Sequence, residues 1–253
     1  MVHFVGAGPG APDLITLRGR KLLDEADVVI YAGSLVNPEL LKGCRKDCEI
    51  FNSAHMTLEE VIAVMECAEK EHKMTVRLHT GDSSLYGAIK EQMDILEKKK
   101  ISYDVCPGVS SFCGAAAALR TEYTLPEISQ SVVITRMEGR TKVPEKEQIE
   151  AWAVHQSTMV IFLSTGLLPE LERRLMQGGY PKDTPAAIVY KASWPEQKVV
   201  MCRLCEIAES AKKHGITKTA LIVVGKVLDS PYERSKLYDP AFATEFRAAR
   251  KDL

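Results

Sequence analysis

Three short stretches of this chain combine glycine with aspartate, serine or proline, residue types that bring backbone and small polar side chains close to a ligand. They are residues 6–10 (GAGPG), 81–87 (GDSSLYG) and 107–111 (PGVSS). Each stretch directly follows a short apolar run that is typical of a buried strand. The carboxyl ends of parallel strands meet at one edge of an open α/β sheet, where such proteins bind ligands. The pattern therefore predicts three loops that line one small-molecule site.

The first loop matches a dinucleotide-binding fingerprint only in part. Pro9 stands between two of its glycines and removes an N–H group that a phosphate would use, and Pro12 follows closely. A nicotinamide-dependent oxidoreductase would also need an acidic residue after the second strand, about 20 residues beyond the loop. The acidic residues at 24–27 instead precede the predicted strand at 28–31. The loop favours a less anionic ligand, and an NAD-dependent oxidoreductase and a non-catalytic binding module are the alternatives from other classes.

The second loop offers polar side chains as well as backbone. Asp82 and the serines after it are expected either to cap the next helix or to accept hydrogen bonds from ribose hydroxyls or an ammonium group. The serines have no histidine and acid in a recognisable triad pattern. If the reaction moves a proton, His79 and Asp104, near strand ends, are the candidate groups, although such residues are more often structural. The identity of a catalytic residue stays open.

Alternation of strands and helices along the chain predicts an α/β protein with mostly parallel sheets in two domains. The first domain is expected at 1–120 and the second at 130–230, with an irregular linker around Pro126 and a charged tail at 231–253. Further expectations are a capping box at 57–60, a small-residue helix at 113–118 that packs closely on a neighbour, an exposed helix at 145–155 and a terminal helix near 241–249.

Composition limits the partners of this chain. Its 33 Lys and Arg residues and 34 Asp and Glu residues give a formal net charge of −1, so nothing global attracts nucleic acid or an anionic membrane. No apolar run approaches the roughly 18 residues that a membrane span needs, and residues 2–5 are too short for a signal peptide. The seven cysteines are scattered, and the single CxxC pair at 202–205 has no second pair to complete a zinc site. These features predict a cytoplasmic protein without a metal.

The three loops, the DLIT stretch at 13–16 and the strand at 220–225 resemble, in order and spacing over nearly the whole chain, the landmarks of the tetrapyrrole methylases. These are class III methyltransferases that use S-adenosylmethionine. Within the family, residues 31–36, 79–82, 135–141 and 189–195 most resemble the members that methylate carbon 11 of a corrin precursor in cobalamin biosynthesis. The chain departs from the family pattern at Ser83, where a proline usually follows Gly81 and Asp82.

The resemblance implies a homodimer in which each chain forms two α/β domains, with the cofactor in a cleft between them. It also implies which positions contact S-adenosylmethionine and its product S-adenosylhomocysteine. These are Pro9, Gly81, Asp82, Leu85, Ser110, Ser111, Leu163, Ala192, Ala220 and Leu221. Small and apolar residues at these positions would enclose adenine while main-chain groups read its edge. For Leu163, Ala220 and Leu221, plain core packing is the alternative.

The substrate that the resemblance implies is a polycarboxylate tetrapyrrole. Arginine and lysine suit its acetate and propionate groups, although a single charge is more often a solvated surface residue. The candidate substrate-binding residues are Ser34, Arg120, Arg136, Arg140, Lys142 and Lys191. Transfer of a methyl group from sulfonium to a nucleophilic ring carbon needs alignment more than side-chain chemistry. The alternatives within this class are methylation of uroporphyrinogen-III, methylation of another corrin carbon, methylation in diphthamide synthesis and methylation of ribose in ribosomal RNA.

Overall fold

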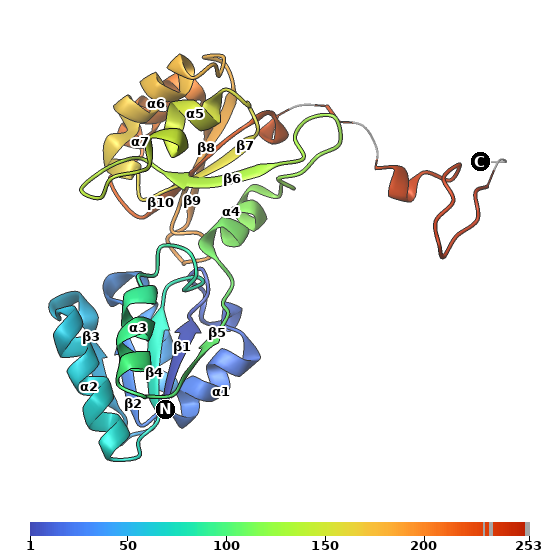
Figure 1. Ribbon diagram of the computed structural model, residues 1–253. Coiled ribbons are helices and arrows are strands. Elements are labelled where there is room, and N and C mark those ends of the chain that lie inside the picture. Colours follow the sequence, from blue (N-terminus) through green and yellow to red (C-terminus); the bar gives the residue numbers. More distant parts are fainter. Residues whose placement is uncertain (230, 233–234, 251–253) are drawn as a thin grey trace. The chain divides into compact units, whose positions relative to one another are not determined.

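A computed structural model of the chain describes residues 1–229, 231–232 and 235–250. Its contacts divide the chain into two units, Met1–Ala118 with Lys191–Lys198, and Leu119–Tyr190 with Val199–Leu253 (Figure 1). Each unit is built on one five-stranded sheet. The segment Lys191–Lys198 belongs to the first unit by its contacts, although in sequence it lies between parts of the second.

The sheet of the first unit is entirely parallel, as predicted. Its strand order is β3-β2-β4-β1-β5. The strands are β1 (Val2–Gly6), β2 (Val28–Tyr31), β3 (Glu49–Asn52), β4 (Thr75–His79) and β5 (Tyr103–Cys106). In register, Val5 of β1 lies beside Leu78 of β4 and Cys106 of β5, so these three strands end together. The loops that follow them therefore start from the same edge of the sheet.

Helices cover both faces of this sheet. They are α1 (Leu17–Glu25), α2 (Leu58–Lys70) and α3 (Lys90–Lys98), and α4 (Ser111–Leu119) follows β5. Leu23 of α1 packs on the face that carries Val5, whereas Met65 of α2 and Leu96 of α3 pack on the face that carries Phe4. Figure 1 shows α2 and α3 together, with α1 on the other side of the sheet. Successive residues of a strand point to opposite faces, and helices cover both faces of this sheet. All the residues of β1 are therefore buried.

The sheet of the second unit has the order β6-β7-β10-β8-β9. Its strands are β6 (Val132–Arg136), β7 (Thr158–Phe162), β8 (Pro185–Tyr190), β9 (Lys198–Arg203) and β10 (Ala220–Val224). β6 and β7 are parallel, but β10 runs antiparallel to both β7 and β8. The prediction of mostly parallel sheets is wrong for this unit. Between β8 and β9 the chain makes turns and no helix, so the strand–helix alternation behind the prediction is broken there.

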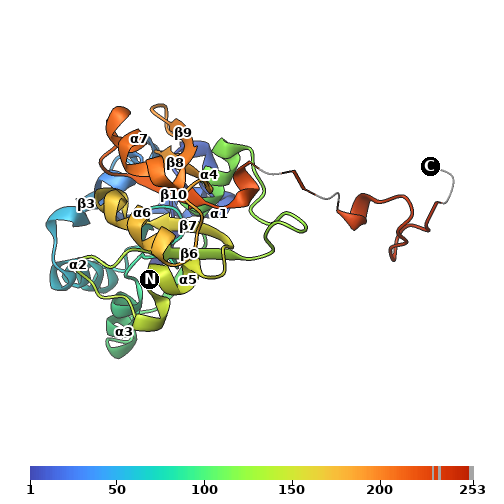
Figure 2. The ribbon, with the colours of Figure 1, turned by 90° about the horizontal axis from the view of Figure 1, so that it is seen from above.

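Three helices pack on the second sheet around one core: α5 (Ile149–Ala153), α6 (Leu168–Gln177) and α7 (Ile207–Lys213). Figures 1 and 2 both show α5 beside α6, where Arg174 Nε lies 2.5 Å from Glu150 Oε1. The prediction of one exposed helix at 145–155 is wrong. A 3-10 turn precedes the short α5, whose Ile149 and Ala153 are buried in the core despite their charged neighbours.

The described part of the tail contains no helix at 241–249, so that prediction is wrong. Side chains bind the backbone N–H groups that a helix would use: Asp239 Oδ1 accepts from Ala241 N–H at 2.9 Å, and Thr244 Oγ1 accepts from Phe246 N–H at 3.3 Å. Residues 233–234 and 251–253 of the predicted tail lie outside the described residues. Among the residues that are described, no helix has the length and apolar character needed to cross a membrane.

Candidate functional site

Backbone hydrogen bonds join the loops that follow β1 and β4. Gly8 N–H donates to the Gly81 carbonyl at 3.2 Å, and Gly81 N–H donates back to the Gly8 carbonyl at 2.9 Å. Just before them, Ala7 N–H donates to the His79 carbonyl at 2.7 Å. The prediction that glycine-containing loops converge at one sheet edge is confirmed. Their backbone groups form one connected surface rather than separate turns.

Glycine is required where these loops touch, because no space remains for side chains. A Cβ atom built on Gly6 would lie 2.6 Å from both the Gly108 Cα and the Gly81 carbonyl oxygen. A Cβ atom on Gly108 would lie 2.1 Å from that same oxygen. Gly81 also has φ of +62°, a conformation that side chains disfavour. These three glycines therefore allow the ends of β1, β4 and β5 to approach backbone to backbone.

Asp82 ties two of the loops together. Its Oδ2 accepts Gly108 N–H at 2.7 Å, and its Oδ1 accepts Ser84 N–H at 2.9 Å. Burial alone would raise the pKa of the Asp82 carboxyl, but the hydrogen bonds from Ser84 and Gly108 outweigh burial and lower that pKa. Asp82 does not cap the next helix, since α3 begins only at Lys90. The carboxylate caps a turn instead and stays charged at neutral pH.

Four other predicted cofactor contacts lie around the first turn of α4. The buried Ser110 accepts Gly114 N–H through its carbonyl at 3.3 Å, and Ser111 opens the helix. A Cβ atom on Gly114 would lie 2.8 Å from Pro9 Cβ and 3.5 Å from Ala192 Cβ. The expected close packing of this small-residue helix is thus confirmed, and its neighbours are Pro9 and Ala192. Leu85 is half-buried in the second loop.

Residues of the segment Lys191–Lys198 complete this loop cluster. Ser193 Oγ accepts Ala11 N–H at 3.0 Å, and a Cβ atom on Gly10 would lie 2.1 Å from Trp194 Cδ1. Asn37, which is buried, donates through Nδ2 to the Gly10 carbonyl at 2.8 Å. The sequence interpretation assigned no site role to Ser193, Trp194 or Asn37. No spacing signal reveals them, because each reaches the first loop from a distant part of the chain.

The remaining predicted cofactor contacts lie in the second unit. Leu163 follows β7 with φ of +52° and a side chain that is 66% exposed. Ala220 opens β10, and its carbonyl accepts a hydrogen bond from Thr165 Oγ1 at 3.1 Å. Since β10 is antiparallel to β7, the start of one lies beside the end of the other. Leu163, Ala220 and the buried Leu221 therefore share one edge of the second sheet, and their contact with a cofactor stays a prediction.

The predicted substrate-binding residues differ in what they already bind. Arg136 donates to the carbonyls of Met137, Thr141 and Lys142 at 3.1 Å each, so its guanidinium braces the loop that follows β6. Three of these candidates are exposed, namely Arg120, Arg140 and Lys142. Lys191 Nζ lies 3.0 Å from Glu196 Oε1. Ser34 lies in a 3-10 turn, Gly33–Leu35, and its side chain is outside the described part of the structure.

The two candidate proton-transfer groups occupy structural surroundings. His79 is 4% exposed and its ring stacks on Phe4 with a centroid distance of 6.2 Å. Burial, with a smaller contribution from the Arg77 charge, lowers the pKa of His79 to about 3. Asp104 Oδ1 lies 2.7 Å from His3 Nδ1 on the neighbouring strand, in the half of β5 away from the loops. Neither geometry favours proton transfer at the loop cluster.

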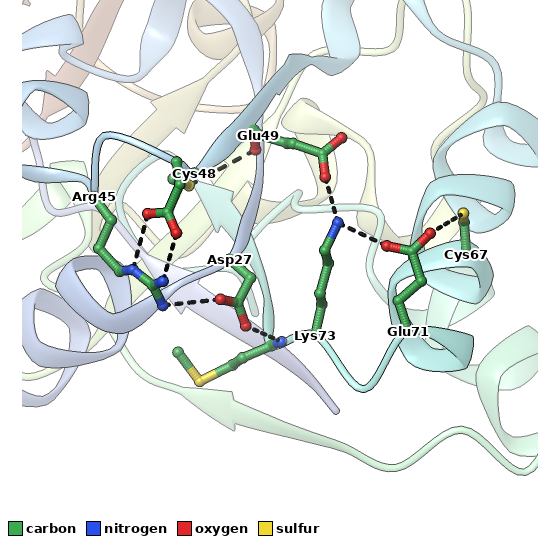
Figure 3. A network of polar contacts seen from close by, with 9 residues as sticks. Asp27, Arg45, Cys48, Glu49, Cys67, Glu71 and Lys73 are labelled. Atoms are coloured by element: carbon green, nitrogen blue, oxygen red, sulfur yellow. Dashed lines mark hydrogen bonds and ion pairs between the residues drawn. The ribbon is translucent and has the colours of Figure 1, made fainter.

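A hollow of about 560 Å³ lies at the other edge of the first sheet, between β2, β3 and α2. Figure 3 shows the ion pairs beside it, in which Lys73 Nζ lies 2.7 Å from both Glu49 Oε1 and Glu71 Oε2. Both carboxylates raise the pKa of Lys73. These residues precede or begin their strands, whereas ligands of parallel sheets bind beyond the carboxyl ends. The loop cluster is therefore the better candidate site.

Comparison with known proteins points to one family. Residues 1–208 match the family model described as Tetrapyrrole (Corrin/Porphyrin) Methylases. A cobalt-precorrin-4 C(11)-methyltransferase of Methanocaldococcus jannaschii is 55% identical over 251 residues, which cover 99% of this chain and 97% of that protein.

Two solved structures agree with this finding. The X-ray structure of a cobalt-precorrin-4 methyltransferase of cobalamin biosynthesis has a TM-score of 0.88 and 43% identity, covering 90% of this chain and 96% of the other. A uroporphyrin-III C-methyltransferase of Thermus thermophilus, complexed with S-adenosylhomocysteine, has a TM-score of 0.74 and 26% identity, covering 90% and 93%.

Proposed function

We infer the function of this chain from its membership of the tetrapyrrole (corrin/porphyrin) methylase family, which the match over residues 1–208 and the 55% identical relative establish. The chain is a methyltransferase. We propose that it methylates carbon 11 of cobalt-precorrin-4, or of precorrin-4 without the metal, in cobalamin biosynthesis. The names of its relatives support this substrate, since the 55% identical protein and the solved structure at TM-score 0.88 are both named as cobalt-precorrin-4 methyltransferases.

The loop cluster of the first unit suits S-adenosylmethionine as the methyl donor. The observation that carries this proposal is the backbone contact among Gly8, Gly81 and Gly108, which leaves main-chain groups and small side chains at the sheet edge. The charged Asp82 can accept a hydrogen bond from a ribose hydroxyl or attract the ammonium group of the cofactor. We assign Pro9, Leu85, Ser110, Ser111 and Ala192 to the same ligand. Leu163, Ala220 and Leu221 are assigned to it by family likeness alone.

When bound, S-adenosylmethionine supplies a methyl group already activated on a positively charged sulfur. The residues of this chain then have to hold and align the ligand, and rigid loops serve that purpose. Gly81 and Asp82 are fixed by bonds to the first and third loops, which keeps the donor from shifting. His79 is neutral at pH 7 because burial lowers its pKa to about 3, so its ring carries no extra proton to donate at that pH.

Exposed cations of the second unit fit the carboxylates of a tetrapyrrole. Arg140 and Lys142 are exposed in the loop after β6, and Arg120 is exposed after α4. Guanidinium groups bind carboxylates in a bidentate manner, which suits acetate and propionate side chains. Arg136 contributes by holding the loop that presents Arg140. We further expect a cytoplasmic homodimer, and light scattering on the purified chain would test the dimer.

The decisive experiment is an assay of the purified chain with S-adenosylmethionine and each of three substrates: cobalt-precorrin-4, precorrin-4 and uroporphyrinogen-III. We expect one methyl group to be added to a precorrin-4 substrate, and NMR of the product should place it on carbon 11. Methylation of uroporphyrinogen-III alone would overturn the proposed substrate but not the cofactor. Binding of NAD without binding of S-adenosylhomocysteine would overturn both.

A further inference from the structure

The segment Lys191–Lys198 joins two strands of the second unit but packs in the first, and its backbone is strained. Lys191 has φ of +46° and Ser193 has φ of +66°, conformations that residues with side chains seldom adopt. Such strain persists only where surrounding contacts enforce it, and it is frequent at ligand sites. Here the enforcing contacts come from the first glycine loop, through the hydrogen bond from Ala11 N–H to Ser193 Oγ.

Trp194 fixes the position of an ammonium group beside that loop. Its indole ring lies against Gly10, so closely that a Cβ atom there would be 2.3 Å from Trp194 Nε1. Lys191 Nζ lies over this ring, 5.0 Å from its centroid, a distance that permits cation–π attraction. The backbone N–H of Trp194 also donates to the Lys191 carbonyl at 3.0 Å. The Lys191 ammonium is therefore held next to the loop that we assign to the cofactor.

Glu196 occupies this ammonium. Its Oε1 lies 3.0 Å from Lys191 Nζ, and the hydrogen bond with Lys191 lowers the pKa of Glu196, so this carboxyl group is ionised at neutral pH. The Lys191 side chain is 24% exposed and that of Glu196 is 57% exposed. An exposed ion pair is weak and exchanges readily with other anions. A carboxylate from solvent can thus replace Glu196 without any change of fold.

We propose that Glu196 is an internal competitor for the substrate: one acetate or propionate group of the tetrapyrrole displaces it from Lys191, which Trp194 keeps in place. This inference rests on the proposed function for the identity of the ligand. No covalent change is involved, since one carboxylate exchanges for another on the same ammonium. Glu196 neutralises Lys191 in the absence of substrate and thereby discriminates against ligands with a single weakly held carboxylate.

The test is a double-mutant cycle read by the fluorescence of uroporphyrin, a stable polycarboxylate tetrapyrrole, titrated with the full-length protein. Glu196→Gln should tighten binding about threefold, the size expected when an exposed ion pair no longer competes. Lys191→Gln should weaken binding. In the Lys191→Gln background, Glu196→Gln should have no further effect, because the contested ammonium is gone. Higher salt should shrink the gain.

The matched control is Glu209→Gln, which removes the same charge from an exposed glutamate of α7. It should leave uroporphyrin binding unchanged, which separates local competition from a change in net charge. If Glu196→Gln fails to tighten uroporphyrin binding, or tightens it by the same factor in the Lys191→Gln background, Glu196 is not an internal competitor. The proposed function would still stand. If the unaltered protein binds neither uroporphyrin nor S-adenosylhomocysteine, both the competitor and the proposed function fail.

Discussion

At the scale of single residues, Asp82 and His79 differ in the surroundings that set their charge. Asp82 keeps a lowered pKa because backbone N–H groups of Ser84 and Gly108 bind its carboxylate. His79 loses its charge because it is buried beside Phe4 and near Arg77. Both follow or end β4, only three positions apart. The end of β4 and the loop after it thus serve different purposes, since Asp82 is a charged acceptor and His79 is a neutral part of the core.

Replacing Asp82 by Asn should weaken binding of S-adenosylhomocysteine about tenfold, the usual scale for a lost charged hydrogen bond. An amide has one acceptor oxygen, so either Gly108 N–H or Ser84 N–H loses its partner. Isothermal titration calorimetry would measure the change. Asp183→Asn, at an exposed aspartate of the second unit, should bind as the unaltered protein does. Equal affinities of the two variants would show that Asp82 has no part in the site.

The buried His79 should make folding sensitive to acid. Its pKa is about 3 in the folded chain against an ordinary value of 6.5, so the unfolded chain takes up a proton first as the pH falls. Stability from this group is complete above pH 6.5 and declines toward pH 3. When the pH falls from 7 to 5, the free energy of unfolding should fall by about 2 kcal/mol less for His79→Gln than for the unaltered protein.

Urea titrations at the two pH values would measure this difference. His55→Gln, at an exposed histidine, is the control and should lose as much stability as the unaltered protein. An identical loss for His79→Gln and His55→Gln would mean that His79 takes up its proton in the folded state at the ordinary pH.

At the scale of elements, the parallel order of β4, β1 and β5 places the three loops on one edge, and their glycines let them touch. The order of the strands alone would leave neighbouring loops separated by the distance between two adjacent strands. Contact arises because Gly6, Gly81 and Gly108 allow backbone to approach backbone at distances that any side chain would block. The close approach is a property of the loops together, since each glycine meets atoms from another strand end.

Gly108→Ala should therefore destabilise the protein by about 1–3 kcal/mol, the usual cost of overpacking, and weaken S-adenosylhomocysteine binding strongly. Its new Cβ atom would lie 2.1 Å from the Gly81 carbonyl oxygen, so one loop must move. Thermal unfolding and calorimetry would measure both effects. Gly139→Ala is the matched control, because a Cβ atom there meets nothing within 4 Å. A Gly108→Ala variant as stable as Gly139→Ala would contradict the packing argument.

At the scale of the whole molecule, the two units carry different kinds of candidate residues. The first holds the glycine loops and Asp82, and the second holds the exposed cations after β6 and α4. If the first set binds the methyl donor and the second the tetrapyrrole, substitutions should affect the two ligands separately. The formal net charge of −1 supports such local recognition, since no global field attracts an anionic substrate.

Replacing Arg140 and Lys142 by Ala should weaken uroporphyrin binding about threefold to tenfold, because exposed charges each contribute modestly. Affinity for S-adenosylhomocysteine should stay unchanged. Arg136→Ala offers a contrast: since its guanidinium binds three backbone carbonyls, it should also lower thermal stability. Fluorescence titration and thermal unfolding would distinguish the cases. Unchanged binding of both ligands in the Arg140 and Lys142 variant would place the tetrapyrrole elsewhere.

Much of the fold could be predicted because local patterns carry it. The strands β1 and β2 are mainly apolar runs bounded by turn residues, and the Thr57–Glu60 capping box does begin α2. Predictions failed where partners distant in sequence decide the outcome. The antiparallel β10 and the short, partly buried α5 depend on the sheet they join, and in the tail Asp239 and Thr244 bind the N–H groups that a helix needs.

The sequence by itself determined the α/β class, the three glycine loops and the family resemblance, because each is written in residues close together along the chain. Only the tertiary structure decided that Asp82 links two loops, that Arg136 braces its own loop and that Trp194 lies against Gly10. It also decided that Lys191 lies over the Trp194 ring and pairs with Glu196. Those contacts join residues from separate segments or depend on the exact path of a strained backbone. Distance and conformation of that kind are consequences of packing, which no local pattern of residues encodes.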